Sequence, residues 1–242
     1  MEKRKPVLVG KNITVRFGDG CDYCRSHVEL EKGRCPVCNT IWAVREANFQ
    51  LYPGEILGIV GESGSGKSTL LKSLYFDQQI TSGEAYLSLY QDGQANIFEC
   101  SSQEKRYLRN HLMGMVYQNP MLGLRMNISS GANIAEKLIA AGNRNSGQMI
   151  ERCKELLEHV EIPVERMKDP PKVFSGGMQQ RVQISKAIAN NPPVLFLDEV
   201  TTGLDLSVQA KVLDLIRSIQ QELGITMMIV SHDLAVIRMM SD

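Results

Sequence analysis

Apolar and polar residues alternate along the first third of the chain, which is the pattern of half-buried β-strands. Residues 8–17, LVGKNITVRF, show this alternation. Residues 43–61 predict a strand, a turn at Pro53-Gly54 and a second, buried strand. Residues 82–90 and 113–119 predict two shorter strands. The front of the chain is therefore expected to be rich in β-structure.

The second half shows helical spacing interrupted by short apolar runs. Residues 131–160 predict helices with a break near 143–146, and residues 176–191 predict a helix that stops at Pro192-Pro193. Residues 194–199 and 225–231 are continuous apolar runs, typical of strands buried on both faces. Between them, apolar residues recur at helical spacing from Val208 to Leu223. Strands that alternate with helices predict a mainly parallel α/β sheet, with a β-rich front and a helical middle appended to it.

Composition narrows the class of protein. The 242 residues include 27 basic and 27 acidic side chains, and this zero net charge argues against a general nucleic-acid binder, so no nucleic-acid partner is expected. No apolar run approaches the roughly 20 residues that span a bilayer, and the start lacks the apolar core of a signal peptide. We expect a cytoplasmic protein, in which paired cysteines indicate metal or redox chemistry rather than structural disulfides.

A glycine-rich segment matches the phosphate-binding pattern G-x-x-x-x-G-K-[ST] and lies between a predicted strand and a predicted helix. Its backbone N–H groups can approach phosphates closely, Lys67 supplies a cation, and the Ser68 hydroxyl is a magnesium ligand. The alternative is a plain glycine-rich loop. The predicted nucleotide-binding residues of this loop are Gly61, Glu62, Ser63, Gly64, Ser65, Gly66, Lys67, Ser68 and Thr69.

Two acids end the predicted strand VLFLDE. Asp198 is placed to hold the magnesium coordination shell, and Glu199 to orient or deprotonate a water molecule. Such a pair is commonly only a solvated strand end. The phosphate-binding loop upstream favours the catalytic interpretation.

The segment FSGGMQQR places Ser175, Gly176 and Gly177 immediately before a predicted helix. A helix N-terminus offers free N–H groups and a favourable dipole to an anion. The alternative is a simple serine N-cap with permissive glycines. One chain with two helix ends suited to phosphate suggests that two chains share each nucleotide.

These motifs carry a resemblance. GESGSGKST, Gln118, FSGGMQQR, VLFLDE, TTGLD and His232 follow one another like the motifs of ABC-type ATPase domains, over nearly all the chain outside the cysteine segment. The resemblance implies an ATP hydrolase with a P-loop NTPase core, an antiparallel β subdomain and a helical subdomain at about 100–180, within a domain that fills 1–242. It also implies ATP and Mg²⁺ as cofactors and a homodimer around two ATP molecules.

The resemblance further implies roles for single residues. Glu199 and His232 would be catalytic, with His232 contacting the γ-phosphate as the switch histidine. Gln118 would also be catalytic, would bind Mg²⁺ together with Ser68, and would couple the nucleotide to movement of a partner. A lone histidine after a strand is usually structural, so the role of His232 rests on the resemblance.

Residues Ser175 to Gly177 would contact the γ-phosphate bound to the opposing subunit, and Asp205 would lie at the dimer seam. Phe17 occupies the position at which such domains stack an aromatic ring on adenine. Its alternative is a core aromatic at the end of a strand.

Three departures from the family pattern stand out. Met178 replaces a common glutamine, and Val200 replaces the proline that usually follows the catalytic glutamate. The chain stops at Asp242, ten residues past His232, where relatives continue with further strands, and we expect a truncated chain.

Cys21, Cys24, Cys35 and Cys38 form two Cys-x-x-Cys pairs with the spacing of a tetrahedral structural zinc site. The ten residues between the pairs are expected to form a small hairpin. Redox-active or merely reduced thiols are the alternatives, and His27 is an outside candidate as a substitute ligand. The segment 18–42 interrupts the predicted front strands, so we interpret it as a zinc knuckle inserted into an ATPase domain rather than a zinc-ribbon binding module.

The partner is a separate question. The chain resembles ATPase subunits of oligopeptide and nickel importers, which act on membrane partners. In residues 119–142, 160–169 and 201–219 it is more similar to ATP-binding subunits of carbon–phosphorus lyase systems, which implies lyase core subunits as partners. Leu124, Arg125 and Met126 are expected to offer an apolar and basic contact, the alternative being that they pack within the helical subdomain.

Overall fold

The computed structural model of the chain describes residues 4–27 and 30–241. Its front is a three-stranded antiparallel sheet with the order β2-β1-β4. The strands are β1 (Leu8–Phe17), β2 (Ile41–Leu51) and β4 (Ser82–Leu87). Alternation of apolar and polar residues, the basis of the prediction, places Leu8, Ile13 and Val15 in the core.

A second, four-stranded sheet is wholly parallel and has the order β3-β7-β6-β5. Its strands are β3 (Ile56–Val60), β5 (Met113–Val116), β6 (Val194–Asp198) and β7 (Thr226–Ser231). The prediction of an α/β fold with an added antiparallel sheet is therefore confirmed. Strand β5 belongs to this sheet, although its residues lie within the segment 100–180 that was expected to be the helical subdomain.

Both faces of the parallel sheet are covered, which explains the continuous apolar runs of β6 and β7. On one face, Leu195, Leu197 and Ile229 pack among helices. On the other, Phe196 and Val230 pack under the antiparallel sheet. Side chains along each strand thus alternate between two cores.

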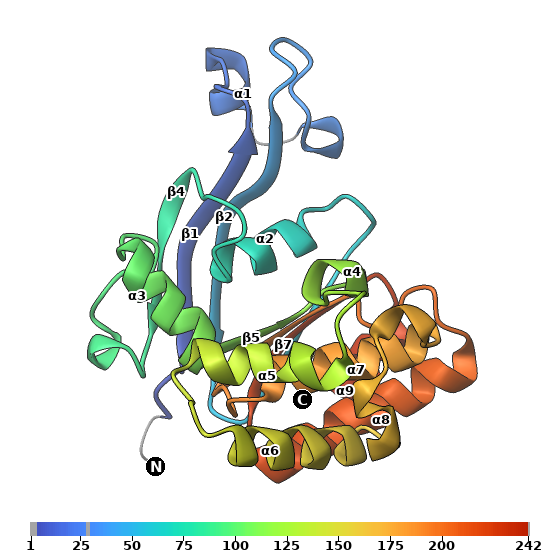
Figure 1. Cartoon of the computed structure of the whole chain (residues 1–242). Coiled ribbons are helices and arrows are strands. Elements are labelled where there is room, and N and C mark those ends of the chain that lie inside the picture. The colour runs from blue at the N-terminus through green and yellow to red at the C-terminus, as the bar shows by residue number, and fades with distance from the viewer. Residues whose placement is uncertain (1–3, 28–29, 242) are drawn as a thin grey trace.

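Helices form much of the remaining chain. Figure 1 shows α5 to α8 gathered on the side of the parallel sheet away from β1, β2 and β4, while α2 lies on the side of the antiparallel sheet. The helices are α1 (Asp22–Ser26), α2 (Lys67–Leu74), α3 (Ser102–Tyr107), α4 (Pro120–Gly123), α5 (Ser130–Ala140), α6 (Ser146–His159), α7 (Gly176–Ile188), α8 (Leu206–Leu223) and α9 (Leu234–Met240). Among the described residues, none of them is long and apolar enough to cross a membrane.

The carboxyl ends of the four parallel strands meet at one edge of the sheet, where ligands of open α/β sheets bind. The phosphate-binding loop follows β3, Gln118 follows β5, Glu199 follows β6 and His232 follows β7. The parallel arrangement of the strands therefore brings together motifs that are up to 171 positions apart in the sequence.

The cysteine segment lies between β1 and β2 and projects beyond the sheet as an arm (Figure 1). The expected hairpin between the cysteine pairs is wrong: residues 22–26 form α1, and residues 31–33 form a 3₁₀ turn. Val28 and Glu29 lie outside the described residues. Both Cys-x-x-Cys pairs lie next to these short elements, so the arm is organised around its sulfur atoms.

Candidate nucleotide site and cysteine knuckle

The phosphate-binding loop runs from the end of β3 into α2, as predicted. The Lys67 ammonium lies inside the loop, where Nζ donates to the Gly61 carbonyl at 2.8 Å and to the Glu62 carbonyl at 2.7 Å. The Ser65 hydroxyl is 3.3 Å from the same nitrogen. Lys67 is only 7% exposed. Its charge is thus concentrated in a loop built from backbone groups.

Glycine is required at one position of this loop by a close backbone approach. Gly66 is the N-cap of α2 with a φ of 90°, and a Cβ there would lie 1.7 Å from the carbonyl oxygen of Ala43 in β2. Only glycine tolerates both the left-handed backbone and this contact. The first turn of α2 is therefore seated directly on β2.

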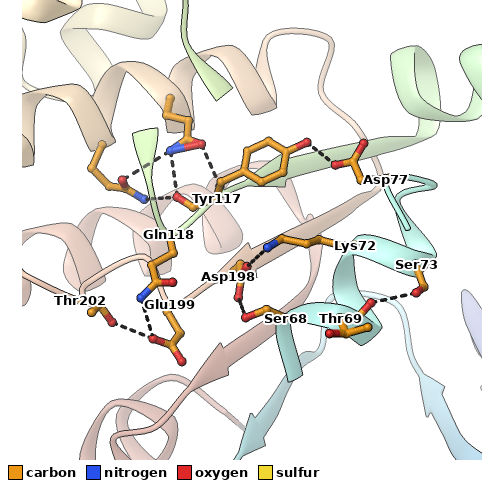
Figure 2. A network of polar contacts seen from close by, with 12 residues as sticks. Ser68, Thr69, Lys72, Ser73, Asp77, Tyr117, Gln118, Asp198, Glu199 and Thr202 are labelled. Carbon is orange, nitrogen blue, oxygen red and sulfur yellow. Dashed lines mark hydrogen bonds and ion pairs between the residues drawn. The ribbon is translucent and has the colours of Figure 1, made fainter. Parts of the chain in front are cut away.

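Ser68 and Asp198 lie against each other although 130 residues separate them. Ser68 Oγ donates to Asp198 Oδ1 at 2.5 Å, and Lys72 Nζ lies 3.9 Å from Asp198 Oδ2 (Figure 2). Asp198 is 1% exposed. Burial raises the pKa of Asp198, and the hydrogen bond from Ser68 and the charge of Lys72 only partly offset this effect. A hydroxyl beside a carboxylate is a pair of hard oxygen donors, which suits Mg²⁺.

Glu199 is the meeting point of three side chains from different segments. Its Oε2 accepts from Gln118 Nε2 at 3.0 Å and from Thr202 Oγ1 at 3.1 Å, as Figure 2 shows, and lies 3.4 Å from His232 Nδ1. Glu199 has a φ of 45°, a left-handed backbone uncommon for residues other than glycine. A carboxylate held in this way beside Asp198 is suited to orient or deprotonate a water molecule.

Residues that the sequence analysis did not single out support the site. Lys72 stands four residues after Ser68, so helical spacing alone would have placed both on one face of α2. Thr202 stands three residues after Glu199 in a turn. Behind them, Gln183 of α7 accepts from the Tyr117 backbone N–H at 2.8 Å and donates to the Tyr117 carbonyl at 3.0 Å, which fixes the chain before Gln118. No sequence signal indicated that last contact.

Of the two predicted magnesium ligands, Ser68 contacts Asp198 and Gln118 contacts Glu199. The two predicted ligands therefore contact the side chains of consecutive residues, Asp198 and Glu199. The remaining loop residues, Ser63 and Gly64, are exposed, and Thr69 accepts a hydrogen bond at its carbonyl from Ser73 within α2.

Ser175 to Gly177 belong to a different part of the molecule from the phosphate-binding loop. Ser175 is the N-cap of α7, and its Oγ accepts from the Met178 backbone N–H at 3.4 Å. Ser175 and Gly176 are exposed. Helix α7 packs on α5, α4, α6 and α8, whereas α2 packs on β2 and β6. Within the single chain, the described contacts do not bring the two helix ends together.

Phe17 and Asp205 lie at exposed positions. Phe17 ends β1, pairs with Ile41 of β2 and is 44% exposed. Asp205 caps α8, where Oδ1 accepts from the Val208 backbone N–H at 3.0 Å, and this bond lowers the pKa of Asp205. The neighbouring Leu206 is 85% exposed.

The expected contact at Leu124, Arg125 and Met126 is largely wrong. Leu124 is buried in the helical core, where Met126 also packs, and Arg125 forms an ion pair with Glu136 at 2.8 Å. The alternative of packing within the helical part holds for the two apolar residues. Exposed apolar side chains come slightly earlier, in α4.

The four cysteines come together as the spacing predicts. Their sulfur atoms all lie within 4.8 Å of one another. The Sγ–Sγ distances are 4.0 Å for Cys21–Cys24, 3.7 Å for Cys21–Cys35 and 3.8 Å for Cys24–Cys38. Zinc–sulfur bonds of ~2.3 Å in a tetrahedron give a sulfur–sulfur separation of about 3.8 Å. The donor set therefore fits zinc, while His27 stacks on Tyr23 instead.

Polar groups around the knuckle act on its thiols. The Thr40 hydroxyl, followed by the Thr40 backbone, lowers the pKa of Cys38 to about 6. At Cys24 the backbone N–H of Cys21 lowers the pKa, and the indole of Trp42 acts in the same direction. Trp42 Nε1 is buried without a hydrogen-bond partner of normal geometry among the described residues. Donors that favour thiolates are the usual surroundings of metal-bound cysteines.

Comparison with known proteins identifies the class. The family described as ABC transporter matches residues 44–202. The chain therefore belongs to the ABC transporter ATP-binding family, whose members are ATPases that bind ATP and Mg²⁺.

Among curated relatives, the chain is 45% identical over 197 residues to the putative phosphonates utilization ATP-binding protein PhnK of Escherichia coli (strain K12), covering 81% of this chain and 76% of that protein. It is 36% identical over 211 residues to the oligopeptide transport ATP-binding protein OppF of Lactococcus lactis subsp. lactis (strain IL1403), covering 85% of this chain and 63% of that protein. The chain thus spans less than two thirds of the importer relative.

Solved structures show the same fold. A dimeric, post-hydrolysis state of the ATP-binding cassette MJ0796 bound to ADP and Pi is 29% identical with a TM-score of 0.78, covering 96% of this chain and 90% of that one. CbiO1 from Clostridium perfringens, part of the ABC transporter complex cbiONQ, has a TM-score of 0.77 at 24% identity, covers 98% of this chain and 83% of that one, and supports the fold alone.

Proposed function

We propose that the chain binds and hydrolyses MgATP as one half of a homodimer, and that dimer closure moves an attached carbon–phosphorus lyase assembly in phosphonate catabolism. The observation that carries the hydrolysis is the convergence of Gln118, Thr202 and His232 on Glu199, beside the pair formed by Ser68 and Asp198. A general base must be oriented before it can act on a water molecule.

Each group then has a task. The amides of the phosphate-binding loop and the Lys67 ammonium bind the β- and γ-phosphates. Ser68 and Asp198 hold Mg²⁺, which neutralises charge on the phosphates when bound, and Gln118 turns toward it. Glu199 orients the attacking water, and His232 contacts the γ-phosphate.

The homodimer follows from the position of Ser175 and Gly176. They are exposed on a helix that packs away from the phosphate-binding loop of the same chain, so they are free to contact the phosphate of a second chain. The exposed Leu206 next to Asp205 supplies apolar area for the same seam. The similar cassette MJ0796 is dimeric, which supports this arrangement.

The knuckle is proposed to hold one structural zinc ion through Cys21, Cys24, Cys35 and Cys38. A closed set of four thiolates leaves no open coordination position, so the ion is not catalytic. Elemental analysis of protein purified without added metal should find about one zinc per chain, and zinc-free protein that takes up none would contradict the site.

The lyase partner is supported by the higher identity to the phosphonate-utilization protein, 45% against 36% for the oligopeptide transport protein. Exposed apolar side chains offer a contact surface: Met121 is 65% and Leu122 is 64% exposed in α4, three and four residues after Gln118. A partner bound there would act on Glu199 through Gln118.

The test uses the full chain in a host whose own copy of the gene is deleted. We expect the tagged protein to co-purify with lyase core subunits and to restore growth on a phosphonate as sole phosphorus source. Met121→Ser with Leu122→Ser should lose both co-purification and growth while keeping ATP hydrolysis. Ile150→Ser, which changes an exposed apolar residue of α6, serves as the matched control and should change neither.

An ATPase subunit of an oligopeptide or nickel importer is the second candidate, because importer ATPases share the fold and 36% identity. A deletion strain that grows normally on phosphonates but loses peptide or nickel uptake would favour it and contradict the lyase assignment.

A further inference from the structure

We infer that the metal ion of the cysteine knuckle sets the affinity of this protein for adenine nucleotides, by holding in place the end of β1 that carries Phe17. The inference rests on the zinc ion proposed above and on the Phe17–adenine contact that the family resemblance implies. It adds a task for the knuckle, which lies outside the phosphate-binding site.

The first observation is the length of the connection between β1 and β2. Phe17 and Ile41 are the last paired residues of the two strands, and all of Gly18 to Thr40 must close the turn. Hairpin loops usually have roughly two to five residues. Closing a long flexible loop has an entropic cost that grows with its length. A metal ion that joins both halves of the loop removes most of this freedom.

The second observation is a single residue that links the knuckle to this strand pair. Thr40 is 2% exposed and immediately precedes Ile41. Its Oγ1 accepts from the Gly20 backbone N–H at 3.0 Å and from Cys38 Sγ at 3.2 Å, and its carbonyl accepts from the Cys35 backbone N–H at 2.9 Å. Two metal ligands are therefore bonded to the residue next to the partner of Phe17.

A second residue, Trp42 of β2, links the knuckle to the pairing of the two strands. Trp42 pairs with Arg16, the residue before Phe17, and its ring lies under the Arg16 guanidinium at 5.7 Å and the Arg45 guanidinium at 4.6 Å. The 3₁₀ turn between the cysteine pairs also packs on this residue, since a Cβ at Gly33 would lie 2.7 Å from the Trp42 carbonyl oxygen. Loss of the ion would therefore loosen Arg16 and Trp42, the pair beside Phe17 in the ladder.

A stacking ring contributes to affinity only if it is already ordered, because ordering it on binding has a cost. Phe17 is exposed and stands at the free end of its strand. Stacking on an aromatic side chain changes the affinity for a base by about tenfold. Loss of the ion should reduce the affinity for adenine nucleotides by a factor of this size. The phosphate-binding loop contacts β2 at Ala43 but is joined covalently to β3 and α2, so its own affinity for phosphates should change little.

The experiment is a cycle of four measurements of the MgADP dissociation constant by calorimetry, which avoids turnover. Wild type and Phe17→Ala are each measured with zinc bound and after removal of zinc by a chelator. We expect zinc removal to weaken MgADP binding by about tenfold in wild type and by less than about twofold in Phe17→Ala. Equal losses in both proteins would overturn the inference, because the ion would then act independently of Phe17.

Magnesium tripolyphosphate, which lacks a base, is the matched ligand. Its affinity is measured by competition with MgADP and should change by less than about twofold when zinc is removed. If tripolyphosphate lost as much affinity as MgADP, the zinc ion would act on the phosphate-binding loop, and the inference would be wrong. Restoring zinc must restore MgADP binding, and Trp42, the one tryptophan of the chain, reports reloading by fluorescence. Irreversible loss of the tryptophan signal would show a folding role alone and overturn the inference.

The outcomes separate this inference from the proposed function. Zinc-loaded wild type that fails to bind MgADP would overturn the nucleotide site itself. Wild type that binds MgADP equally well with and without zinc would overturn only the coupling between knuckle and Phe17. A knuckle that binds no zinc would also overturn the coupling while leaving ATP hydrolysis untouched.

Discussion

Gln118 Nε2 donates a hydrogen bond to Glu199 Oε2 at 3.0 Å and joins two segments 81 residues apart. Gln118 follows β5, and Glu199 follows the neighbouring strand β6. Because α4 begins two residues after Gln118, any displacement of α4 reaches the Glu199 carboxylate through a single hydrogen bond. The contact thus offers a short route from a partner surface to the water-activating group.

Glu199→Gln should leave nucleotide binding intact and reduce ATP turnover by about 10²- to 10⁴-fold, the usual contribution of a general base. The amide keeps the size of the side chain but cannot accept a proton, so a dimer closed around MgATP should accumulate. Phosphate release and size-exclusion chromatography in MgATP measure the two effects. Glu222→Gln, at an exposed position of α8, is the control. Wild-type turnover in Glu199→Gln would refute the role of this carboxylate.

Ser175→Arg should abolish hydrolysis without abolishing nucleotide binding. The substitution puts a bulky side chain at the exposed N-terminus of α7, and its positive charge opposes the helix dipole. Ser175→Thr keeps a hydroxyl at the N-cap and should retain most activity. Nucleotide affinity and turnover are measured for both. Normal hydrolysis by Ser175→Arg would mean that the site is not shared between chains.

Asp198→Asn should abolish Mg²⁺-dependent hydrolysis yet stabilise the nucleotide-free protein. Asp198 is buried, and its raised pKa shows that burial outweighs the stabilisation from Ser68 and Lys72. A gain of about 1 kcal/mol in the free energy of unfolding corresponds to a rise in Tm of about 2–4 °C for a domain of this size.

The raised pKa of Asp198 also determines how the free energy of unfolding depends on pH. The folded protein holds the Asp198 proton more tightly than the unfolded chain, so the free energy of unfolding falls as pH rises from about 3.9, the value for a free aspartate, through the higher folded value. The advantage of Asp198→Asn should therefore be absent below about pH 4 and grow as pH rises above it. Thermal melts across this range measure it. A wild type more stable than Asp198→Asn at pH 7 would contradict this account.

Much of this fold was predictable because local pattern and tertiary burial agree. Alternation over residues 8–17 coincides with β1, and the continuous run of β6 reflects burial on both faces of the sheet. The phosphate-binding loop and the cysteine cluster were predictable because their chemistry lies in short motifs.

What escaped prediction depends on packing between distant segments. Apolar character did not distinguish Leu124, which is buried, from Leu122, which is exposed, although they are only two residues apart. The support of Tyr117 by Gln183 joins residues 66 positions apart. Between the cysteine pairs, the end of α1 and a 3₁₀ turn stand where a hairpin was expected, and no pattern of apolar and polar residues there indicated these short elements.

Thr40→Val should weaken zinc binding by about 10- to 100-fold, the usual effect of losing a hydrogen bond to a metal ligand from outside the coordination shell. Valine matches threonine in shape but removes the hydroxyl that accepts from the Gly20 N–H and lies 3.2 Å from Cys38 Sγ, where it can donate to the thiolate. It also removes the group that lowers the pKa of Cys38 to about 6, so Cys38 should hold its proton to higher pH and compete less well for zinc near pH 7. Thr40→Ser keeps the hydroxyl and should bind zinc almost as wild type does. Competition with a chromogenic chelator at pH 6, 7 and 8 measures the affinities, and the defect of Thr40→Val should shrink as pH rises. A valine variant with wild-type zinc affinity at pH 7 would show that the hydroxyl does not support the site.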